Sequence, residues 1–479
     1  MKKVFSILTM FAVALATGFF SADKAEAIPA FARQMQMSCK SCHFQHFPKL
    51  NAFGRAFKAN GYTDVAVDTI NGDWGSSLPV NLNMSWVTKI RYLKNVDNDA
   101  CNDCTGGAKG ELQIVDEGVF FIGGRVAEHV GAAVEVAGGA WANGTIVFGH
   151  DLESLHTHLG LAVWSTDGAG PFWGKEIFNT GLIRGARGWE NRDMTQSAAL
   201  FYRADMNDSE GIAGGAATNS ASGLTMYANH EWFFASLGAW APGQGPGGAG
   251  ANTVDVGVDF AGVYRFALTP PQIFGFDTMV GVYGVWGGSS YAGQAEQVDV
   301  EAHGIDFQAQ GNVTDGISLE ITGNFLYDTG NPGDRNMYGR TVNSNLRNNI
   351  RTQHASFAGT TIYGQDQRAY QVGFDLGFLS DRLISKFNYL HRSAVPYALG
   401  VGTRQDVLGA SVDNRASVDI LSLGAYYNIR ENVSLRPEIS WVVGGDGFRD
   451  RAGSGNNSGI DAVHLGNDTE FILMLMYAF

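Results

Sequence analysis

Five consecutive residues, Cys39-Lys40-Ser41-Cys42-His43, have types and a spacing that can do chemistry. In this C-x-x-C-H pattern the two thiols add to the vinyl groups of a porphyrin, and the histidine becomes an axial ligand of the iron. A zinc site would need four ligands, and no second C-x-x-C or H-x-H lies close in the same segment. A thioredoxin-like dithiol would need a surrounding βαβ pattern, which is absent. The motif therefore predicts one covalently attached haem c, with Cys39, Cys42 and His43 as cofactor-binding residues and His43 as the metal ligand.

The sixth ligand of the iron is left open by the sequence, with Met35, Met37 and His46 as the candidates. Three residues separate His43 from His46, and such a segment spans at most ~10 Å. The chain would have to pass round the porphyrin edge, so we favour a structural role for His46. The two methionines approach from the other side of the cysteines and fit a Met/His ligand pair, but packing is the simpler interpretation of each.

The first 27 residues have the pattern of a secretory signal peptide. Lys2 and Lys3 precede an apolar run at 4–20, and Ala25-Glu26-Ala27 forms an A-x-A cleavage site. Export agrees with the motif, because haem of this type is attached outside the cytoplasm. The net charge of the 479-residue chain is −14, which favours cations and argues against nucleic acid as a partner.

Residues 28–77 are interpreted as a small helical unit that carries the haem. Pro48 fits the first turn of a helix, Leu50, Phe53 and Phe57 follow on one face, and Gly61 can end the helix. So short a unit rarely has an adequate core of its own. We therefore expect it to be held by the covalent haem or to pack inside something larger.

Residues 78–479 change to alternating apolar and polar positions, which is the period of β-strands. Examples are Val80, Leu82, Met84 and Trp86; Val254, Val256 and Val258; Ile317, Leu319 and Ile321; and Phe471, Leu473, Leu475 and Tyr477. A soluble sandwich would turn the apolar face inward, whereas an outer-membrane barrel turns it towards lipid. Export, 12% aromatic residues and the terminal Phe479 favour the barrel.

The connections between these strands alternate between short and long. Short turns are expected near 314–315, 380–381 and 430–431, and long polar loops at 330–365, 397–414 and 447–466. Bacterial outer-membrane barrels have short periplasmic turns and long outer loops. The number of strands between 119 and 203 is ambiguous by one. Because single-chain bacterial barrels have an even number, the sequence predicts sixteen antiparallel strands following a small helical cytochrome plug.

Two further groups of residues could bind metal, although each has a simpler interpretation. Cys101 and Cys104 are expected to form a local disulfide in an outer loop. The alternative is a carboxylate-lined metal entry point that uses Asp97, Asp99 and Asp103, which are more simply solvated loop residues. His156 and His158 are expected to share one face of a strand, either as polar lumen residues or as a metal pair.

The residues around the motif resemble the fused outer-membrane monohaem cytochrome c–porins of iron-oxidising bacteria. The resemblance is specific over residues 29–62, and beyond them it rests only on length, strand character and the terminal phenylalanine. The stretches that carry it are Phe31-Ala32-Arg33-Gln34, then Cys39-Lys40-Ser41-Cys42-His43-Phe44-Gln45-His46-Phe47-Pro48, then Leu50-Asn51-Ala52-Phe53-Gly54-Arg55, Phe57-Lys58 and Gly61-Tyr62.

The resemblance implies an outer-membrane enzyme that oxidises extracellular Fe(II) at its single haem. Fe(II) would be the electron donor, a periplasmic c-type cytochrome the acceptor, and outer-membrane lipid the surroundings of the barrel. The residues carried over are Cys39, Cys42 and His43, and no catalytic residue beyond the haem is expected. Two alternatives stay open: a haem-bearing diffusion porin with a gating or sensing role, and a surface electron conduit for a different donor.

Overall fold

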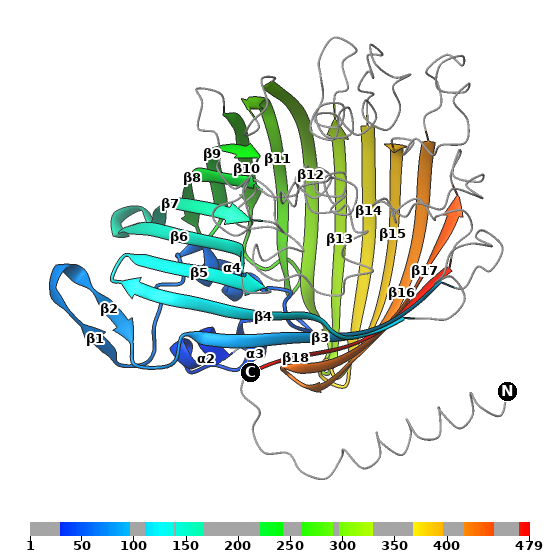
Figure 1. The fold of residues 1–479 in the computed structure, drawn as a ribbon, viewed down its shortest axis with the longest axis horizontal. Helices are drawn as coiled ribbons and strands as arrows, with labels where there is room; N and C mark the ends of the chain where they lie inside the picture. The colour runs from blue at the N-terminus through cyan, green and yellow to red at the C-terminus, as the bar shows by residue number, and fades with distance from the viewer. Residues whose placement is uncertain are drawn as a thin grey trace.

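The computed structural model describes residues 29–95, 111–137, 140–166, 221–242, 260–290, 297–328, 367–395, 416–444 and 469–479. Within them, sixteen strands form one closed antiparallel barrel, in which each strand pairs with its neighbours in sequence and β18 pairs with β3 to close the ring (Figure 1). The predicted mainly β fold of sixteen antiparallel strands is confirmed. The predicted signal peptide, Cys101, Cys104 and the three nearby aspartates lie outside the described residues.

The barrel strands are long and follow one another without crossovers. Their bounds are β3 Met84–Asn95, β4 Glu111–Ala127, β5 Val130–Ala137, β6 Ala140–Leu152, β7 Thr157–Thr166, β8 Ala221–His230, β9 Phe233–Pro242, β10 Ala261–Leu268, β11 Phe276–Ser290, β12 Gln297–Thr314, β13 Ile317–Asp328, β14 Gln367–Phe378, β15 Leu383–Val395, β16 Ala416–Arg430, β17 Val433–Gly444 and β18 Thr469–Ala478.

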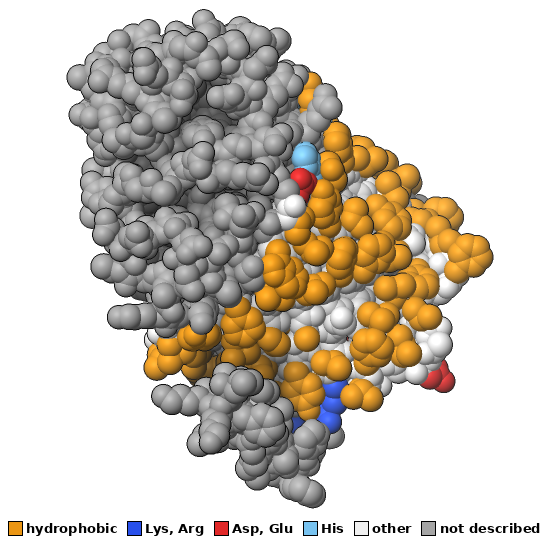
Figure 2. All heavy atoms as spheres, turned by 90° about the vertical axis from the view of Figure 1, so that its right-hand side faces the viewer, with side chains coloured by type: hydrophobic (Ala, Val, Ile, Leu, Met, Phe, Trp, Pro, Cys, Tyr) orange, Lys and Arg blue, Asp and Glu red, His pale blue; other side chains and the backbone are white. Residues whose placement is uncertain are grey.

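The two faces of the wall differ in polarity as an outer-membrane barrel requires. On β13, Ser318, Glu320 and Thr322 are buried on the lumen side, whereas the neighbouring apolar positions face outward. The hydrophobic side chains that Figure 2 shows cover most of the outer surface of the strands in view, and few charges interrupt them. Outward apolar and inward polar side chains are the reverse of a soluble sandwich, so this wall is built to face lipid.

The short turns lie at one end of the barrel, as the sequence predicts. Residues 315–316 join β12 to β13, 379–382 join β14 to β15, and 431–432 join β16 to β17. The two ends of the barrel sequence meet at this end too. Trp86 N donates to Phe479 O at 2.8 Å, and Phe479 N donates to Trp86 O at 3.0 Å. We refer to this end as the short-turn end, and the length rule for bacterial barrels assigns it to the periplasm.

The N-terminal segment lies inside the short-turn end and forms a plug (Figure 1). It contains the helices α2 Pro29–Met35, α3 Cys39–Cys42 and α4 Ala52–Ala59, and a hairpin of β1 Thr69–Asn71 and β2 Ser77–Pro79 follows it. In the part of the chain that the structure describes, no helix is long and apolar enough to cross a membrane.

The start of the plug helix differs from the sequence prediction. The helix begins at Ala52 rather than at Pro48, because the side chain of Asn51 caps it by accepting a hydrogen bond from Gly54 N at 2.8 Å. Its predicted apolar face is also only partly correct, since Phe57 is buried but Phe53 is 42% exposed. Gly61 follows the helix with a φ of +71°, a left-handed conformation that favours glycine, so the predicted helix end is confirmed.

Candidate functional site

The C-x-x-C-H motif forms a single helical turn. A tight loop follows it and brings Asn51 back beside Cys42. His43 N donates to Cys39 O at 2.8 Å and closes the turn. Beyond it, Phe44 N donates to Lys49 O at 3.0 Å and Asn51 N donates to Cys42 O at 3.0 Å. These backbone bonds bring α4 against α3, so the geometry of the motif depends on the loop 43–51 and not on the five residues alone.

His43 is oriented by a backbone carbonyl. Its Nδ1 lies 3.2 Å from Lys49 O, so the hydrogen bond assigns the proton to Nδ1 and leaves Nε2 as the lone-pair nitrogen. Burial lowers the pKa of His43 to about 4, against the opposing effect of its backbone hydrogen bonds. The ring is therefore neutral near pH 7. A neutral imidazole whose second nitrogen is held by a carbonyl is the usual form of an iron or zinc ligand.

The two cysteines sit beside an apolar cavity rather than in a redox-active setting. Cys39 is 5% exposed, and burial raises the pKa of the Cys42 thiol to about 11. A reactive dithiol needs a lowered thiol pKa, so the environment argues against thioredoxin-like chemistry. The apolar cavity is lined by Phe31, Met35, Met37, Cys39, Cys42, His43, Phe47, Phe57, Tyr62 and Phe121, among others.

Aromatic side chains hold the walls of this apolar cavity in place. The ring of Phe31 stacks on Tyr62 at 5.1 Å between centroids and meets the edges of Phe57 at 5.3 Å and Phe121 at 5.6 Å. Phe121 belongs to strand β4, so the barrel wall contributes to the cavity as well as the plug. Such edge-to-face and offset pairs add to the stability that burial provides.

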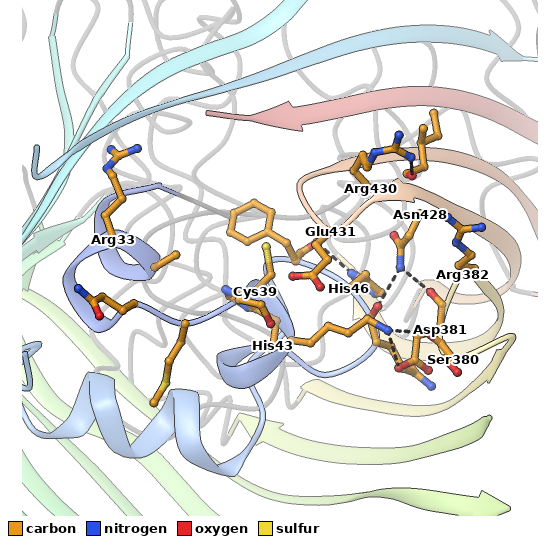
Figure 3. A pocket seen from close by; sticks show the side chains of 18 of the residues that line it. Arg33, Cys39, His43, His46, Ser380, Asp381, Arg382, Asn428, Arg430 and Glu431 are labelled. Carbon is orange, nitrogen blue, oxygen red and sulfur yellow. Dashed lines mark hydrogen bonds and ion pairs between the residues drawn. The ribbon is translucent and has the colours of Figure 1, made fainter. Parts of the chain in front are cut away.

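A second, larger cavity of about 1330 Å³ adjoins the first and shares Cys39, His43 and Phe47 with it. It lies between the plug and the turns β14–β15 and β16–β17 (Figure 3). Its charged lining residues are Arg33, Lys40, Asp381, Arg382, Arg430 and Glu431. Two thiols, one available imidazole nitrogen, an apolar floor and adjacent space of this size fit a covalently attached porphyrin.

The structure separates the candidates for the sixth ligand. Met35 and Met37 line the apolar cavity beside His43, whereas His46 lines only the larger cavity. Both ring nitrogens of His46 have partners, since Nδ1 lies 3.0 Å from Phe47 O and Nε2 lies 3.2 Å from Lys386 Nζ. Burial, followed by the positive charges of Lys386, Lys49 and Arg436, lowers the pKa of His46. The ring is therefore a neutral acceptor for the ammonium group of Lys386.

A buried charge cluster attaches the plug to the wall, and we call Lys49, Glu320, Asp375 and Lys386 the latch. Lys49 Nζ contacts both Glu320 and Asp375, and Lys386 Nζ lies 2.5 Å from the Asp375 carboxylate. Burial alone would lower the pKa of Lys49, but the two carboxylates hold it above its ordinary value. Removing one member of such a buried cluster is costly, because its partners stay buried without compensation.

Further hydrogen bonds join the same loop to the wall around the latch. Gln45 Nε2 donates to Ser318 Oγ at 3.0 Å, Asn428 Nδ2 donates to Gln45 O at 2.9 Å, and Arg436 donates to Phe47 O. The latch was not predicted from the sequence. A signal was present, because Glu320 and Asp375 each occupy a polar position between apolar neighbours on a strand. Such positions face the lumen.

The predicted histidine pair on β7 is wrong. His156 lies in the turn before the strand with a φ of +48°, whereas β7 begins at Thr157. His158 is 7% exposed, and its Nδ1 lies 2.8 Å from Asp151 Oδ1. Among the described residues, no group of three histidine, cysteine or acidic side chains is placed to hold a metal ion.

Neither a protein-family model nor a curated protein matches the chain. Several solved structures align along most of it at low identity. OmpT of Vibrio cholerae is 10% identical with a TM-score of 0.41, covering 86% of this chain and 100% of that chain. Salmonella typhi OmpF in complex with daunomycin is 11% identical with a TM-score of 0.42, covering 86% and 100%. An anion-selective porin from Comamonas acidovorans is 11% identical with a TM-score of 0.42, covering 83% and 98%.

The closed barrel and its outward apolar wall define the class of this protein as an outer-membrane β-barrel. The structures it is similar to are porins and outer-membrane channels. The predicted Fe(II)-oxidising enzyme is contradicted by these comparisons, which return channels instead. No family model or curated protein supports the resemblance to fused cytochrome–porins.

Proposed function

We propose that this protein is an outer-membrane diffusion channel whose lumen carries a haem-bearing plug with a gating or sensing role. The observation that supports it best is the loop 43–49 inside the closed barrel. Its first residue, His43, has a free Nε2 beside the two cysteines, and its last residue, Lys49, attaches the plug to the wall. The ligand residue and the attachment of the plug therefore belong to one short loop.

Lys49 connects the proposed haem ligand His43 to the barrel wall, using a different atom for each contact. Its carbonyl oxygen orients the imidazole of His43, and its ammonium group contacts Glu320 and Asp375 on the wall. A haem c bound to Cys39, Cys42 and His43 supplies one-electron redox chemistry. A shift of the His43 ring moves the carbonyl that holds it, and the same residue then transmits that movement to the latch. This link favours gating or sensing over a passive structural cofactor.

The location of the motif favours a redox partner on the periplasmic side. The larger cavity beside Cys39 is lined by turns at the short-turn end, which the length rule assigns to the periplasm. The bilayer core is about 30 Å thick, so a donor at the outer surface would lie far from this cavity. We propose a periplasmic c-type cytochrome as the partner that exchanges electrons with the plug.

Covalent haem attachment is the first expected result. Wild-type protein produced in a host with periplasmic cytochrome c maturation should keep its haem in a denaturing gel. The Cys39→Ser/Cys42→Ser variant should lose that signal completely, because no thiol is left to form a thioether bond. The migration of unheated samples reports whether the variant barrel still folds. Wild-type protein without covalent haem would overturn the cofactor proposal, and absence of conductance in planar bilayers would overturn the channel proposal.

His46→Gln is expected to leave the axial ligands of the iron unchanged, because both nitrogens of His46 already have partners, the backbone carbonyl of Phe47 and the ammonium group of Lys386. Absorption and magnetic circular dichroism spectra of the oxidised and reduced protein measure this directly. Met35→Leu and Met37→Leu are the companion variants, and a methionine ligand predicts a changed spectrum in one of them. A change of iron spin state in His46→Gln alone would contradict the assignment.

A further inference from the structure

A third cavity, of about 640 Å³, lies at the short-turn end on the other side of α4 from the cysteines. The plug contributes Phe53, Arg55, Ala56 and Asn60, and the wall contributes the turns β6–β7, β8–β9 and β10–β11. It shares no lining residue with either cavity beside the cysteines. The cavity is therefore distinct from the proposed haem site.

The charge of this cavity is opposite to that of the larger cysteine cavity. Four carboxylates, from Asp151, Glu153, Glu231 and Asp277, accompany the single guanidinium of Arg55, which gives a formal charge of −3 with neutral histidines. The larger cysteine cavity has four basic and two acidic lining residues, a formal charge of +2. Carboxylates around a recessed opening raise the local concentration of cations.

Buried acceptor atoms without partners provide an independent indication of a ligand. Asn229 lines the cavity and is 8% exposed, and its Nδ2 donates to Asn60 Oδ1 at 3.2 Å. Its Oδ1 has no hydrogen-bond partner among the described residues. Leaving a buried acceptor unsatisfied costs about 1–3 kcal/mol, so a donor such as water or a hydrated cation is expected beside it.

The same feature continues deeper along the wall, beyond Arg55. Arg55 is 4% exposed, and it donates to Leu50 O at 2.9 Å and to Gln310 Oε1 at 3.4 Å. On the same strand as Gln310, Asp306 Oδ1 and Gln308 Oε1 are buried acceptors for which the described part of the chain provides no hydrogen-bond partner. A line of acceptors thus extends from the acidic cavity into the lumen. Two guanidinium groups lie along it: Arg55 donates to Gln310, and Arg265 pairs with the other oxygen of Asp306 at 2.5 Å.

We propose that the acidic cavity is the periplasmic mouth of a cation-selective passage between α4 and the barrel wall. The permeating species are hydrated monovalent cations such as K⁺. Tight coordination of a bare metal ion is not needed, and the described residues offer no three-ligand group for it. Arg55, which lines the cavity and is buried, would limit this passage. The inference rests on the proposed channel function and adds the class of solute.

The test is the reversal potential of single channels in planar bilayers under a tenfold KCl gradient. The haem-loaded full-length mature protein should show the sign of cation selectivity. Glu153→Gln/Glu231→Gln should move the reversal potential towards zero while channels stay open, because both side chains line the mouth on exposed turns. The matched control is Asp73→Asn/Glu128→Gln, which removes the same charge from exposed residues at the same end outside the cavity.

The outcomes separate the inference from the function on which it rests. A shift in the Glu153/Glu231 variant but not in the control supports the passage. Anion selectivity of the wild type, or equal shifts in both variants, overturns the passage and leaves the channel function intact. Absence of any conductance in the wild type overturns the channel function, and the passage with it.

Discussion

Lys49→Met is expected to release the plug and to raise the conductance of the channel. Methionine keeps most of the length of the side chain but removes the ammonium group that contacts Glu320 and Asp375. Breaking a buried pair by removing one partner costs about 3–5 kcal/mol. A cost of about 3 kcal/mol changes the ratio of attached to released plug by roughly a hundredfold, since 1.4 kcal/mol corresponds to tenfold.

The cost of Lys49→Met is expected at the lower end of this range, because the partners of Lys49 in the latch keep other contacts. Asp375 keeps its contact with Lys386, and Glu320 still accepts hydrogen bonds from Gln308 at 2.8 Å and from Gln310 at 2.7 Å. The wall side of the latch therefore stays satisfied in part, and the barrel itself should fold. The loss falls on the plug, which is the part that the variant is designed to release.

Lys40→Met is the matched control for this variant. Lys40 also joins the plug to the wall, but it lies 3.7 Å from Asp381 with a side chain that is 42% exposed. Exposed pairs of this kind contribute about 0–1 kcal/mol. Single-channel open probability and protease cleavage within the plug should therefore rise in Lys49→Met and stay near wild type in Lys40→Met. Equal behaviour of the two variants would show that the buried cluster does not attach the plug.

Much of the fold could be predicted because its signals are local. The alternation of Ser318, Glu320 and Thr322 with apolar neighbours is written along a single strand, and the short turn near 430–431 is visible beside two such strands. The C-x-x-C-H motif is equally local. Each of these features depends on residues within a few positions of one another, and a single sequence contains that information.

The missed features depend on contacts between distant segments or on single side chains. Lys49 meets Glu320 and Asp375, which lie 271 and 326 residues away, so nothing near Lys49 in sequence indicates its partners. The helix start was misplaced because Pro48 and the cap residue Asn51 are both suitable starting signals, and the hydrogen bond to Gly54 N decides between them. His156 lies outside the expected strand because it adopts the left-handed conformation at the end of the turn, and the strand begins only at Thr157.

These contacts also explain why so small a plug needs the barrel. Besides its internal hydrogen bonds, the plug is bound to the wall through Gln45, Phe47 and Lys49, each of which contacts wall residues. At the far end of the plug, Tyr227 OH donates to Ala59 O at 2.6 Å. The expected shortage of core is therefore met by packing inside the larger domain. A change that disturbs the plug internally should act on the haem site first and on the barrel last.

Gly54→Ala is expected to disrupt the C-x-x-C-H turn while sparing the barrel. A Cβ at this position would lie 2.1 Å from Cys42 O and 2.9 Å from Leu50 Cδ2. The carbonyl is backbone and already accepts from Asn51 N, so it cannot move without breaking the loop that orients His43. Alanine is favoured over glycine in a helix by about 1 kcal/mol. Forced overpacking costs typically about 1–3 kcal/mol, and an overlap this deep lies at the upper end.

Gly54→Ala is therefore expected to destabilise the plug, even though helix propensity alone predicts that alanine would stabilise the helix. The ratio of haem to protein should fall in Gly54→Ala, and the remaining haem should lose its native absorbance at a lower temperature. Gly72→Ala is the control, because a Cβ there meets nothing nearer than 3.4 Å and the backbone φ of −121° suits alanine. A Gly54→Ala protein with full haem content and unchanged thermal stability would mean that α4 does not press against Cys42 as described.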